Sequence, residues 1–319
     1  MPADIVVASW NVHSGVDGWG RQFDVVAACR SIDADVLVLQ ETWSSDGGHR
    51  LACQVGEALG YHVEESPIAR AVMFAPPRDA GRKWGPPPWE RALHGPRVDR
   101  RSVRQGHALD GRRTSEARVS AEHRAQPGRA CHELDPRDAY ALDEALKTNT
   151  TRREHGRRDL GRGTVGLAVL SRLEVGHVET WDLGQMCRDP TRRSAIAVEV
   201  VTGEPDAAQR RRMLVVGTHL SHLRQGSRIQ LARLRQMLAS RNGPVVPAVL
   251  AGDMNLPGPP LLAFLPGWKR AVRGRTWPAW CPVAQSDHIL FTAAVTGTGE
   301  VLPIRGSDHL PVRARLSFT

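Results

Sequence analysis

Residues 248–255, with the sequence AVLAGDMN, decide how the rest of the chain is interpreted. A short apolar run stops at Gly252 and leaves Asp253 and Asn255 two positions apart. Residues i and i+2 of an extended segment point to the same face, so a carboxylate and a carboxamide leave the end of a predicted strand together. Such a pair suits a phosphate group and the water that attacks it. Because Gly-Asp-x-Asn is also an ordinary turn sequence, the interpretation needs support from elsewhere in the chain.

The ends of other predicted strands also carry polar residues. These strands are recognised as short apolar runs rich in β-branched residues. Six strand ends supply an acid, an amide or an imidazole: Asn11 after IVVASW, Glu41 after VLVLQ, His219 after MLVVGT, Asp253 after AVLAG, Asp287 before HILF, and Asp308 with His309 before LPVRARL. Loops at strand ends commonly build the sites of α/β proteins, so we expect these side chains to face one cleft.

The order of the predicted elements favours a layered α/β fold. Helical spacing of apolar residues predicts helices over 23–32, 51–59 and 229–238, separated by predicted strands. The run over 35–42 is continuously apolar, as expected for a strand covered on both faces, and is predicted to end at Glu41. Neither G-x-G-x-x-G after the first strand nor a Walker-type motif occurs, which excludes the common nucleotide-cradling folds.

The net charge of +9 is unevenly distributed along the 319 residues. Residues 76–163 contain 20 Lys and Arg against 13 Asp and Glu, an excess of 7 that leaves only +2 for the rest. This segment is rich in Arg, Gly and Pro and poor in apolar residues, so we interpret it as a poorly ordered basic insertion in one domain spanning 1–319. It is either a solvated loop or an arm that contacts substrate or nucleic acid.

Cysteine usage and the amino terminus indicate a cytoplasmic protein. Five scattered cysteines without a C-x-x-C pair are interpreted as free thiols. Neither a signal-type apolar stretch nor an apolar run of about 18 residues, the length of a membrane span, is present in the sequence. The oligomeric state stays open.

The polar set favours a hard cation. Glu41, Asp308 and the carbonyl of Asn11 offer oxygen ligands, which suit Mg²⁺ or Mn²⁺ rather than zinc. Two histidines and a carboxylate remain for acid–base work and for stabilising charge on a phosphoryl group.

The motifs WNVH, LQET, GTHLSH, GDMN, SDHIL and SDHLPV, in this order, resemble the endonuclease/exonuclease/phosphatase superfamily. The resemblance covers residues 1–75 and 164–319. It implies a four-layer α-β-β-α sandwich of two packed mixed sheets with outer helices. It also implies a Mg²⁺-dependent hydrolase that cleaves a phosphoester by in-line attack of water.

The resemblance further implies a role for each residue. Asn11, Glu41 and Asp308 would hold the metal. Asp253 would orient or deprotonate the attacking water, and Asn255 would bind a phosphate oxygen. His309, held in one tautomer by Asp287, would contact the scissile phosphate, and His219 would bind the phosphate or help the leaving group.

The sequence allows two interpretations for each of three further residues. His13 stands where abasic-site enzymes of the superfamily carry a short acidic or amide residue, so it lies near the metal or orients its loop. Trp277 and Trp280 either anchor a Pro-rich loop or contact substrate.

Three functions are weighed. A phosphodiesterase, such as an endonuclease, is favoured over a phosphatase or phosphodiesterase of lipid or inositol phosphates. A non-catalytic phosphate-binding protein on the same scaffold is the alternative from another class.

Overall fold

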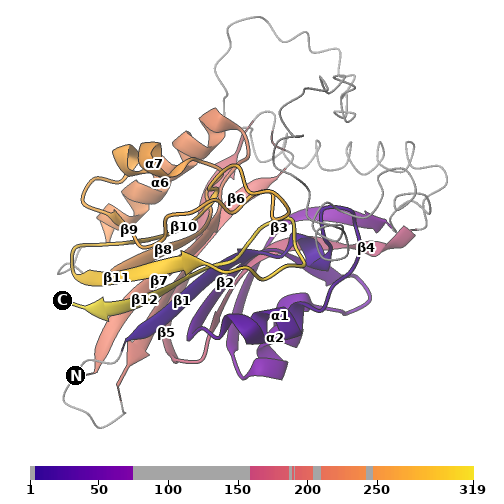
Figure 1. Cartoon of the computed structure of the whole chain (residues 1–319), viewed down its shortest axis with the longest axis horizontal. Coiled ribbons are helices and arrows are strands. Elements are labelled where there is room, and N and C mark those ends of the chain that lie inside the picture. The colour runs from indigo at the N-terminus through magenta and orange to yellow at the C-terminus, as the bar shows by residue number, and fades with distance from the viewer. Residues whose placement is uncertain (1–3, 75–158, 187–188, 190, 204–209, 242–246) are drawn as a thin grey trace, which may run out of the picture.

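A computed structural model of the chain describes residues 4–74, 159–186, 189, 191–203, 210–241 and 247–319. It contains two six-stranded sheets packed face to face (Figure 1). In the first sheet the order is β11 (Val295–Val301), β12 (Val312–Phe318), β1 (Ile5–Asn11), β2 (Val36–Ser45), β4 (Asp159–Ser171) and β3 (His62–Phe74). In the second it is β5 (Glu174–Gln185), β6 (Arg192–Thr202), β7 (Arg211–His219), β8 (Ala248–Asp253), β10 (Asp287–Phe291) and β9 (Lys269–Arg270).

Helices cover the outer faces of both sheets. The first sheet is covered by α1 (Val25–Ile32) and α2 (Leu51–Leu59), and the second by α6 (Arg224–Ser240) and α7 (Gly258–Phe264), on opposite sides of the molecule in Figure 1. The predicted four-layer arrangement of mixed sheets and outer helices is therefore confirmed. Asp24 begins α1 by accepting a hydrogen bond from the Ala27 N–H, and Gly60 ends α2 in a left-handed conformation (φ 72°).

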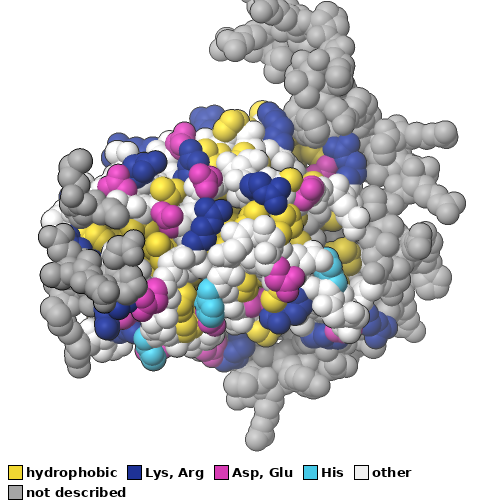
Figure 2. All heavy atoms as spheres, turned by 90° about the horizontal axis from the view of Figure 1, so that it is seen from below, with side chains coloured by type: hydrophobic (Ala, Val, Ile, Leu, Met, Phe, Trp, Pro, Cys, Tyr) yellow, Lys and Arg dark blue, Asp and Glu magenta, His cyan; other side chains and the backbone are white. Residues whose placement is uncertain are grey.

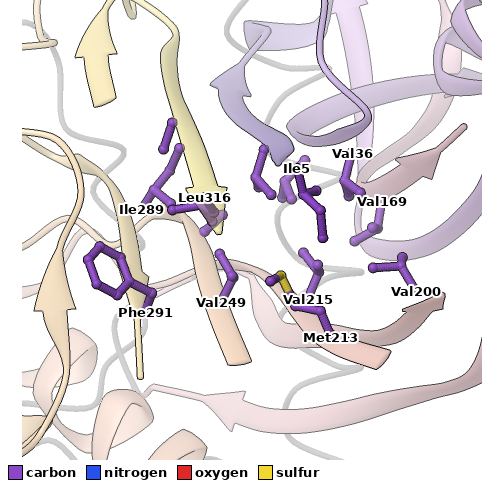
Figure 3. Packing of buried hydrophobic residues seen from close by; sticks show 14 of the residues in the cluster. Ile5, Val36, Val169, Val200, Met213, Val215, Val249, Ile289, Phe291 and Leu316 are labelled. Atoms are coloured by element: carbon purple, nitrogen blue, oxygen red, sulfur yellow. The ribbon is translucent and has the colours of Figure 1, made fainter. Parts of the chain in front are cut away.

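The main core lies between the sheets. Figure 3 shows Ile5, Val36 and Val169 of the first sheet facing Met213, Val215 and Val249 of the second, all essentially inaccessible to solvent. The continuously apolar run in β2 is explained because Val36 and Val38 enter this core while Leu37 and Leu39 pack beneath α1 and α2. Burying each such side chain stabilises the fold by about 1.5–3 kcal/mol.

Each sheet has one parallel pair near its centre, β1 with β2 and β7 with β8, while the other pairs of described strands are antiparallel. The consecutive strands β6 and β7 pair antiparallel. The carboxyl ends of the two parallel pairs carry Asn11, His219 and Asp253.

Several predicted boundaries were wrong. β2 does not end at Glu41 but continues to Ser45, and α6 begins at Arg224 rather than at residue 229. β4 begins at Asp159, inside the segment assigned to the insertion, because its amino-terminal half pairs with β3. The rest of the predicted insertion, 76–158, lies outside the described residues.

Some elements were not predicted. β5 has mostly exposed or half-buried residues along its first half, so it lacks a clear apolar period. α7 lies in a stretch rich in Pro and Gly, and its prolines occupy the first turn of the helix, where proline is tolerated. β9 and β11 complete the set of missed strands.

The described residues show a surface of mixed charge (Figure 2) and cysteines that are free thiols, as the sequence predicted. On the face shown in Figure 2, acidic side chains lie among basic ones rather than leaving one sign alone. Cys29, Cys53 and Cys281 are free thiols, whereas Cys131 and Cys187 lie outside the described residues. No helix in the described part of the chain is long and apolar enough to cross a membrane.

Candidate active site at the ends of the two parallel strand pairs

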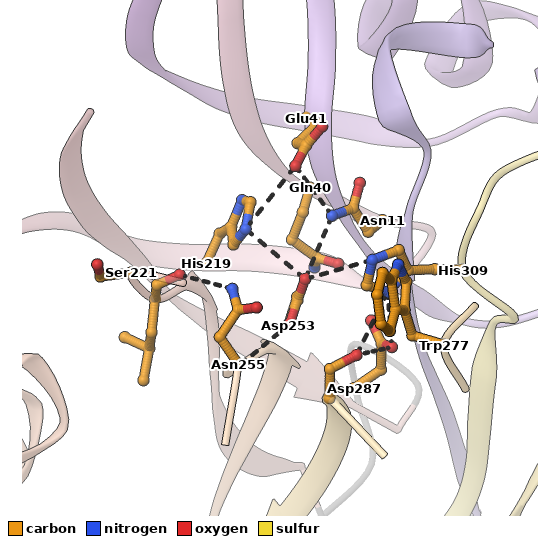
Figure 4. Close-up of polar contacts among 12 residues, drawn as sticks. Asn11, Gln40, Glu41, His219, Ser221, Asp253, Asn255, Trp277, Asp287 and His309 are labelled. Atoms are coloured by element: carbon orange, nitrogen blue, oxygen red, sulfur yellow. Dashed lines mark hydrogen bonds and ion pairs between the residues drawn. The ribbon is translucent and has the colours of Figure 1, made fainter. Parts of the chain in front are cut away.

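Asp253 lies at the centre of the polar cluster, between His219 and His309 (Figure 4). It is the last residue of β8, pairs with His219 in β7 on one side and with Asp287 in β10 on the other, and is 2% exposed. The backbone before it depends on Gly252, whose φ is 155°. A Cβ there would lie 1.9 Å from the carbonyl oxygen of Thr218. Glycine at this position therefore allows β8 to deliver Asp253 beside β7.

Glu41 reaches the cluster through an irregularity in β2. The pairing of β2 with β4 shifts register between Gln40 and Thr42, and Glu41 has a φ of 56°. A left-handed conformation costs a residue other than glycine about 1–2 kcal/mol. The Glu41 side chain accepts a hydrogen bond at Oε1 from Asn11 Nδ2 at 3.1 Å. Glu41 is thus a bulge residue within a strand and not a strand end.

Asn11 joins the two sheets. Its Nδ2 also donates to Asp253 Oδ2 at 3.3 Å, so one amide connects a carboxylate of the first sheet with one of the second. Its Oδ1 accepts from the His13 N–H at 3.0 Å.

His309 lies between two carboxylates. Its Nδ1 is 2.9 Å from Asp287 Oδ2, and its Nε2 is 3.7 Å from Asp253 Oδ2. Asp287 also accepts from the Ser286 hydroxyl at 2.9 Å. The predicted contact of Asp287 with the His309 ring is present, and it fixes which ring nitrogen faces Asp253.

This acid–imidazole–acid row has strongly shifted pKa values. Burial alone would lower the pKa of His309, but Asp287 and Asp253 outweigh it and raise the pKa to about 10. Burial and the charge of Asp287 raise the pKa of Asp253 to about 7. Burial works against the charge of Asp287 as well, yet the His309 imidazolium holds the pKa of that carboxyl below its usual range. At neutral pH the His309 ring is therefore positively charged.

His219 has the opposite character. Its Nε2 lies 3.7 Å from Asp253 Oδ2 and 3.9 Å from Glu41 Oε1. Burial, followed by the charges of Arg193 and His309, lowers the pKa of His219 well below 6.5. The neutral ring can accept a proton or donate one hydrogen bond to a phosphate oxygen.

Asn255, two residues after Asp253, has a left-handed backbone conformation (φ 50°). Its backbone N–H donates to Asp253 Oδ1 at 3.0 Å, and its Nδ2 donates to the Leu220 carbonyl at 2.9 Å. An amide nitrogen has two protons, so the second can reach a further acceptor such as a phosphate oxygen.

Asp308 is set apart from the other predicted ligands. Its Oδ1 lies 3.5 Å from His13 Nδ1, and its Oδ2 accepts from Trp277 Nε1 at 3.3 Å. It is tied to Asn11 through Ser307, whose hydroxyl donates to the Asn11 carbonyl at 2.6 Å and to Asp308 Oδ1 at 3.3 Å. Trp277 is 42% exposed and its ring centroid is 6.5 Å from that of His309, so it lies at the entrance of the site.

A buried ion pair behind His219 was not predicted from sequence. Arg193 and Asp189 are 6% and 0% exposed, and Arg193 Nε is 3.3 Å from Asp189 Oδ2. In the sequence RRSAIAVEVV, Arg193 is a charged residue at the beginning of an apolar strand. The acidic Asp189 four residues earlier is the one local indication of an ion pair.

Two groups of residues could hold a metal ion. Asp253, Asp287 and His309 offer ligand atoms within 4.8 Å of one another. In this group, His309 Nδ1 already binds Asp287 Oδ2 at 2.9 Å. The second group is the predicted set of Asn11, Glu41 and Asp308, whose oxygen atoms are of the kind that a hard divalent cation prefers, and Ser307 links Asn11 to Asp308.

The fold and the site define a class of proteins in which two face-to-face mixed sheets present acids, amides and imidazoles at their strand ends. The model of the Endonuclease/Exonuclease/phosphatase family matches residues 8–309. The chain therefore belongs to this family, whose members act as phosphoesterases and generally depend on divalent metals. No curated protein matched the sequence.

Solved structures show the same fold at low identity. The endonuclease/exonuclease/phosphatase from Beutenbergia cavernae DSM 12333 is 19% identical over 99% of this chain and 72% of that chain, with a TM-score of 0.52. The human Nocturnin catalytic domain with bound sulfate anion is 16% identical over 100% and 94%, with a TM-score of 0.56. A mannosyl-6-phosphatase from Bacteroides thetaiotaomicron VPI-5482 is 14% identical over 98% and 100%, with a TM-score of 0.53.

Proposed function

We propose that the chain is a Mg²⁺-dependent phosphodiesterase that hydrolyses its substrate by in-line attack of an activated water. The observation that carries this proposal is the position of Asp253, which lies between the charged His309 and the neutral His219 and is bonded to Asn11. A basic carboxylate, a fixed cation and a neutral imidazole are then available around one phosphate.

The metal would be held by Asn11, Glu41 and Asp308. When bound, it would supply positive charge that offsets the negative charge developing on the phosphoryl oxygens. Mn²⁺ is expected to substitute because it also prefers oxygen ligands.

The roles of the other residues follow from their protonation. Asp253 has a pKa of about 7, which is well matched to taking a proton from water near neutral pH. His309 keeps its proton and stabilises a non-bridging phosphate oxygen, with Asp287 fixing the ring. Asn255 holds a second phosphate oxygen, and His219 donates a hydrogen bond to the phosphate or to the leaving group.

A diester is favoured over a monoester because the immediate partners of Asp253 include a single fixed positive charge, His309, together with two neutral side chains, Asn11 and His219. A diester carries one negative charge, whereas a monoester carries close to two at neutral pH. The similarity to a mannosyl-6-phosphatase makes a phosphate monoester the second substrate to assay.

The test measures hydrolysis of bis-p-nitrophenyl phosphate and p-nitrophenyl phosphate with Mg²⁺, Mn²⁺ or EDTA. We expect metal-dependent cleavage of the diester, abolished by EDTA, and a fall of about 10²–10⁴-fold in Asp253→Asn. Asn at this position keeps an acceptor for the Asn255 N–H, so the fold should be retained. If no phosphoester is cleaved in any metal while calorimetry shows tight phosphate binding, the chain is a binding protein and the proposal fails.

A further inference from the structure

A hollow lined by aromatic rings lies beside the candidate active site. Its volume is about 390 Å³, toward the lower end of the roughly 300–1,000 Å³ of small-molecule sites. A chain segment after β1 forms one wall, and the loops before β10 and before β12 form the other. The lining residues that matter here are Asp17, Trp19, Phe23, Trp280, Arg305 and Ser307.

Two tryptophans form one side of the hollow. The ring centroids of Trp19 and Trp280 are 4.6 Å apart with planes inclined at 58°, and both rings are half-buried. Phe23 contributes a third ring and packs at 5.5 Å against the fully buried Trp10. Aromatic faces are therefore both accessible and fixed.

Two glycines bring backbone directly against these rings. A Cβ on Gly18 would lie 2.5 Å from Cζ3 of Trp280, and one on Gly306 (φ 144°) would lie 2.5 Å from Cδ2 of Phe23. Any other residue at either position would displace an aromatic wall. The hollow is thus preformed by close packing, which lowers the ordering cost of binding a ligand.

The hollow is connected to the candidate metal ligands through short contacts. Ser307, which lines it, donates to the Asn11 carbonyl at 2.6 Å. The Ala279 N–H, next to Trp280, donates to the Asp308 carbonyl at 2.7 Å. A substrate whose phosphate contacts a cation held by Asn11 and Asp308 would have its neighbouring group close to this hollow.

The edge of the hollow is polar. Asp17 accepts at Oδ1 from the Trp19 N–H and at Oδ2 from Arg21 Nε, and the exposed side chains of Gln22 and Arg305 complete the rim. A planar ring with hydrogen-bonding groups on its edge matches aromatic faces surrounded by an acid, an amide and guanidinium groups.

We propose that this hollow binds the nucleobase of a nucleotide phosphodiester substrate, with Trp280 and Trp19 as the stacking surface. The inference rests on the proposed phosphodiesterase function and names its substrate class. It also assigns Trp280 to substrate binding, whereas Trp277 lies outside the hollow, against His309 and Asp308.

The test compares two diesters that share a leaving group. One is the p-nitrophenyl ester of thymidine 5′-monophosphate, and the other is methyl p-nitrophenyl phosphate, which lacks the nucleoside. We expect the intact chain to prefer the nucleoside ester in kcat/KM. Stacking contributes about 1–3 kcal/mol per base, so Trp280→Leu should lower the ratio of the two kcat/KM values by about 5- to 150-fold.

Two further variants control for misfolding. Trp19→Leu changes the second stacking ring and should lower the same ratio. Trp268→Leu removes a half-buried tryptophan packed on the outer core of the second sheet, away from the hollow, and should leave the ratio within about twofold.

Binding is measured separately from turnover, by calorimetry with thymidine monophosphate and with base-free ribose 5-phosphate. Tighter binding of the nucleotide, lost in Trp280→Leu, supports the inference even if neither ester is hydrolysed, in which case only the proposed function fails. Hydrolysis of both esters with an unchanged ratio in the variants overturns the inference alone. An equal fall for both esters also overturns it, because the shared p-nitrophenyl ring would then be the group in contact.

Discussion

Replacing Asp287 by Asn should discharge the His309 ring near neutral to mildly alkaline pH. In the native chain the difference between a pKa of about 10 and the ordinary 6.5 corresponds to about 5 kcal/mol in favour of the charged ring. Asp287 Oδ2 at 2.9 Å is the nearer of the two contacting carboxylates, and the variant leaves only Asp253 at 3.7 Å and the more distant charge of Asp308. A close opposite charge accounts for about 1–3 pH units, so the pKa of His309 should fall by that amount.

The sign of the stability effect follows from the raised pKa. His309 contributes stability that is fully present below pH 6.5, the unfolded value, and is lost as the pH rises toward 10, because the unfolded chain releases its proton first. Asp287→Asn should therefore cost about 1–4 kcal/mol at pH 6 and flatten the decline between pH 6.5 and 10. At a pH above the lowered pKa of His309, turnover should fall by about 10²–10⁴-fold because the ring has then lost its charge.

The assay is a ¹⁵N-resolved titration of the histidine rings, together with denaturant unfolding at several pH values. Ser286→Ala serves as the comparison variant because it removes neutral contacts, to Asp287 Oδ2 at 2.9 Å and to His309 Nδ1 and Thr276 Oγ1 at 3.4 Å, and leaves both carboxylates in place. A neutral hydrogen bond contributes about 1 kcal/mol, so the His309 pKa should stay high. An unchanged His309 titration and unchanged turnover in Asp287→Asn would refute the assigned roles of both residues.

Three other changes probe the surroundings of the site. Gly252→Ala places a Cβ 1.9 Å from the Thr218 carbonyl and should lower the unfolding free energy by about 1–3 kcal/mol. It should also displace the neighbouring Asp253 carboxylate, which would be seen as lost turnover with a normal circular dichroism spectrum. Asp189→Asn leaves Arg193 buried without its carboxylate and should cost about 3–5 kcal/mol in denaturant unfolding, against less than about 1 kcal/mol for breaking an exposed ion pair. Burial lowers the pKa of His288 to about 4 from 6.5, so stability is present above pH 6.5 and lost as the pH falls toward 4; His288→Gln should remove about 3 kcal/mol of this pH dependence.

The central strands could be predicted because their sequence reflects burial on two faces. In β8, Val249 and Ala251 face the other sheet while Ala248 and Leu250 face the helices, so the strand is apolar throughout. The acids and imidazoles are conspicuous where such runs stop, and the structure brings Asn11, His219, Asp253, Asp287 and His309 together.

Other features depend on backbone geometry or on distant partners. The bulge that directs Glu41 into the cluster leaves no mark in the pattern of apolar residues. The sequence therefore predicted a strand end at Glu41. The Asp189–Arg193 pair and the aromatic hollow depend on loops whose contacts are formed only when both sheets are assembled. The assignment of Asn11, Glu41 and Asp308 as metal ligands stays a prediction, with Asp308 reached through Ser307.

The architecture explains why such a site needs both sheets. Asn11 ends a parallel pair in the first sheet, whereas His219 and Asp253 end a parallel pair in the second, and the Asn11 amide bonds a carboxylate of each. The sheets pack tightly at Gly217, where a Cβ would lie 2.7 Å from Cγ2 of Val169 and 2.8 Å from Cγ1 of Val38. Because packed cores transmit strain, the spacing of the apolar layer sets the distance between Asn11 of the first sheet and Asp253 of the second. The apolar residues between the sheets therefore position the candidate site as well as stabilising the fold.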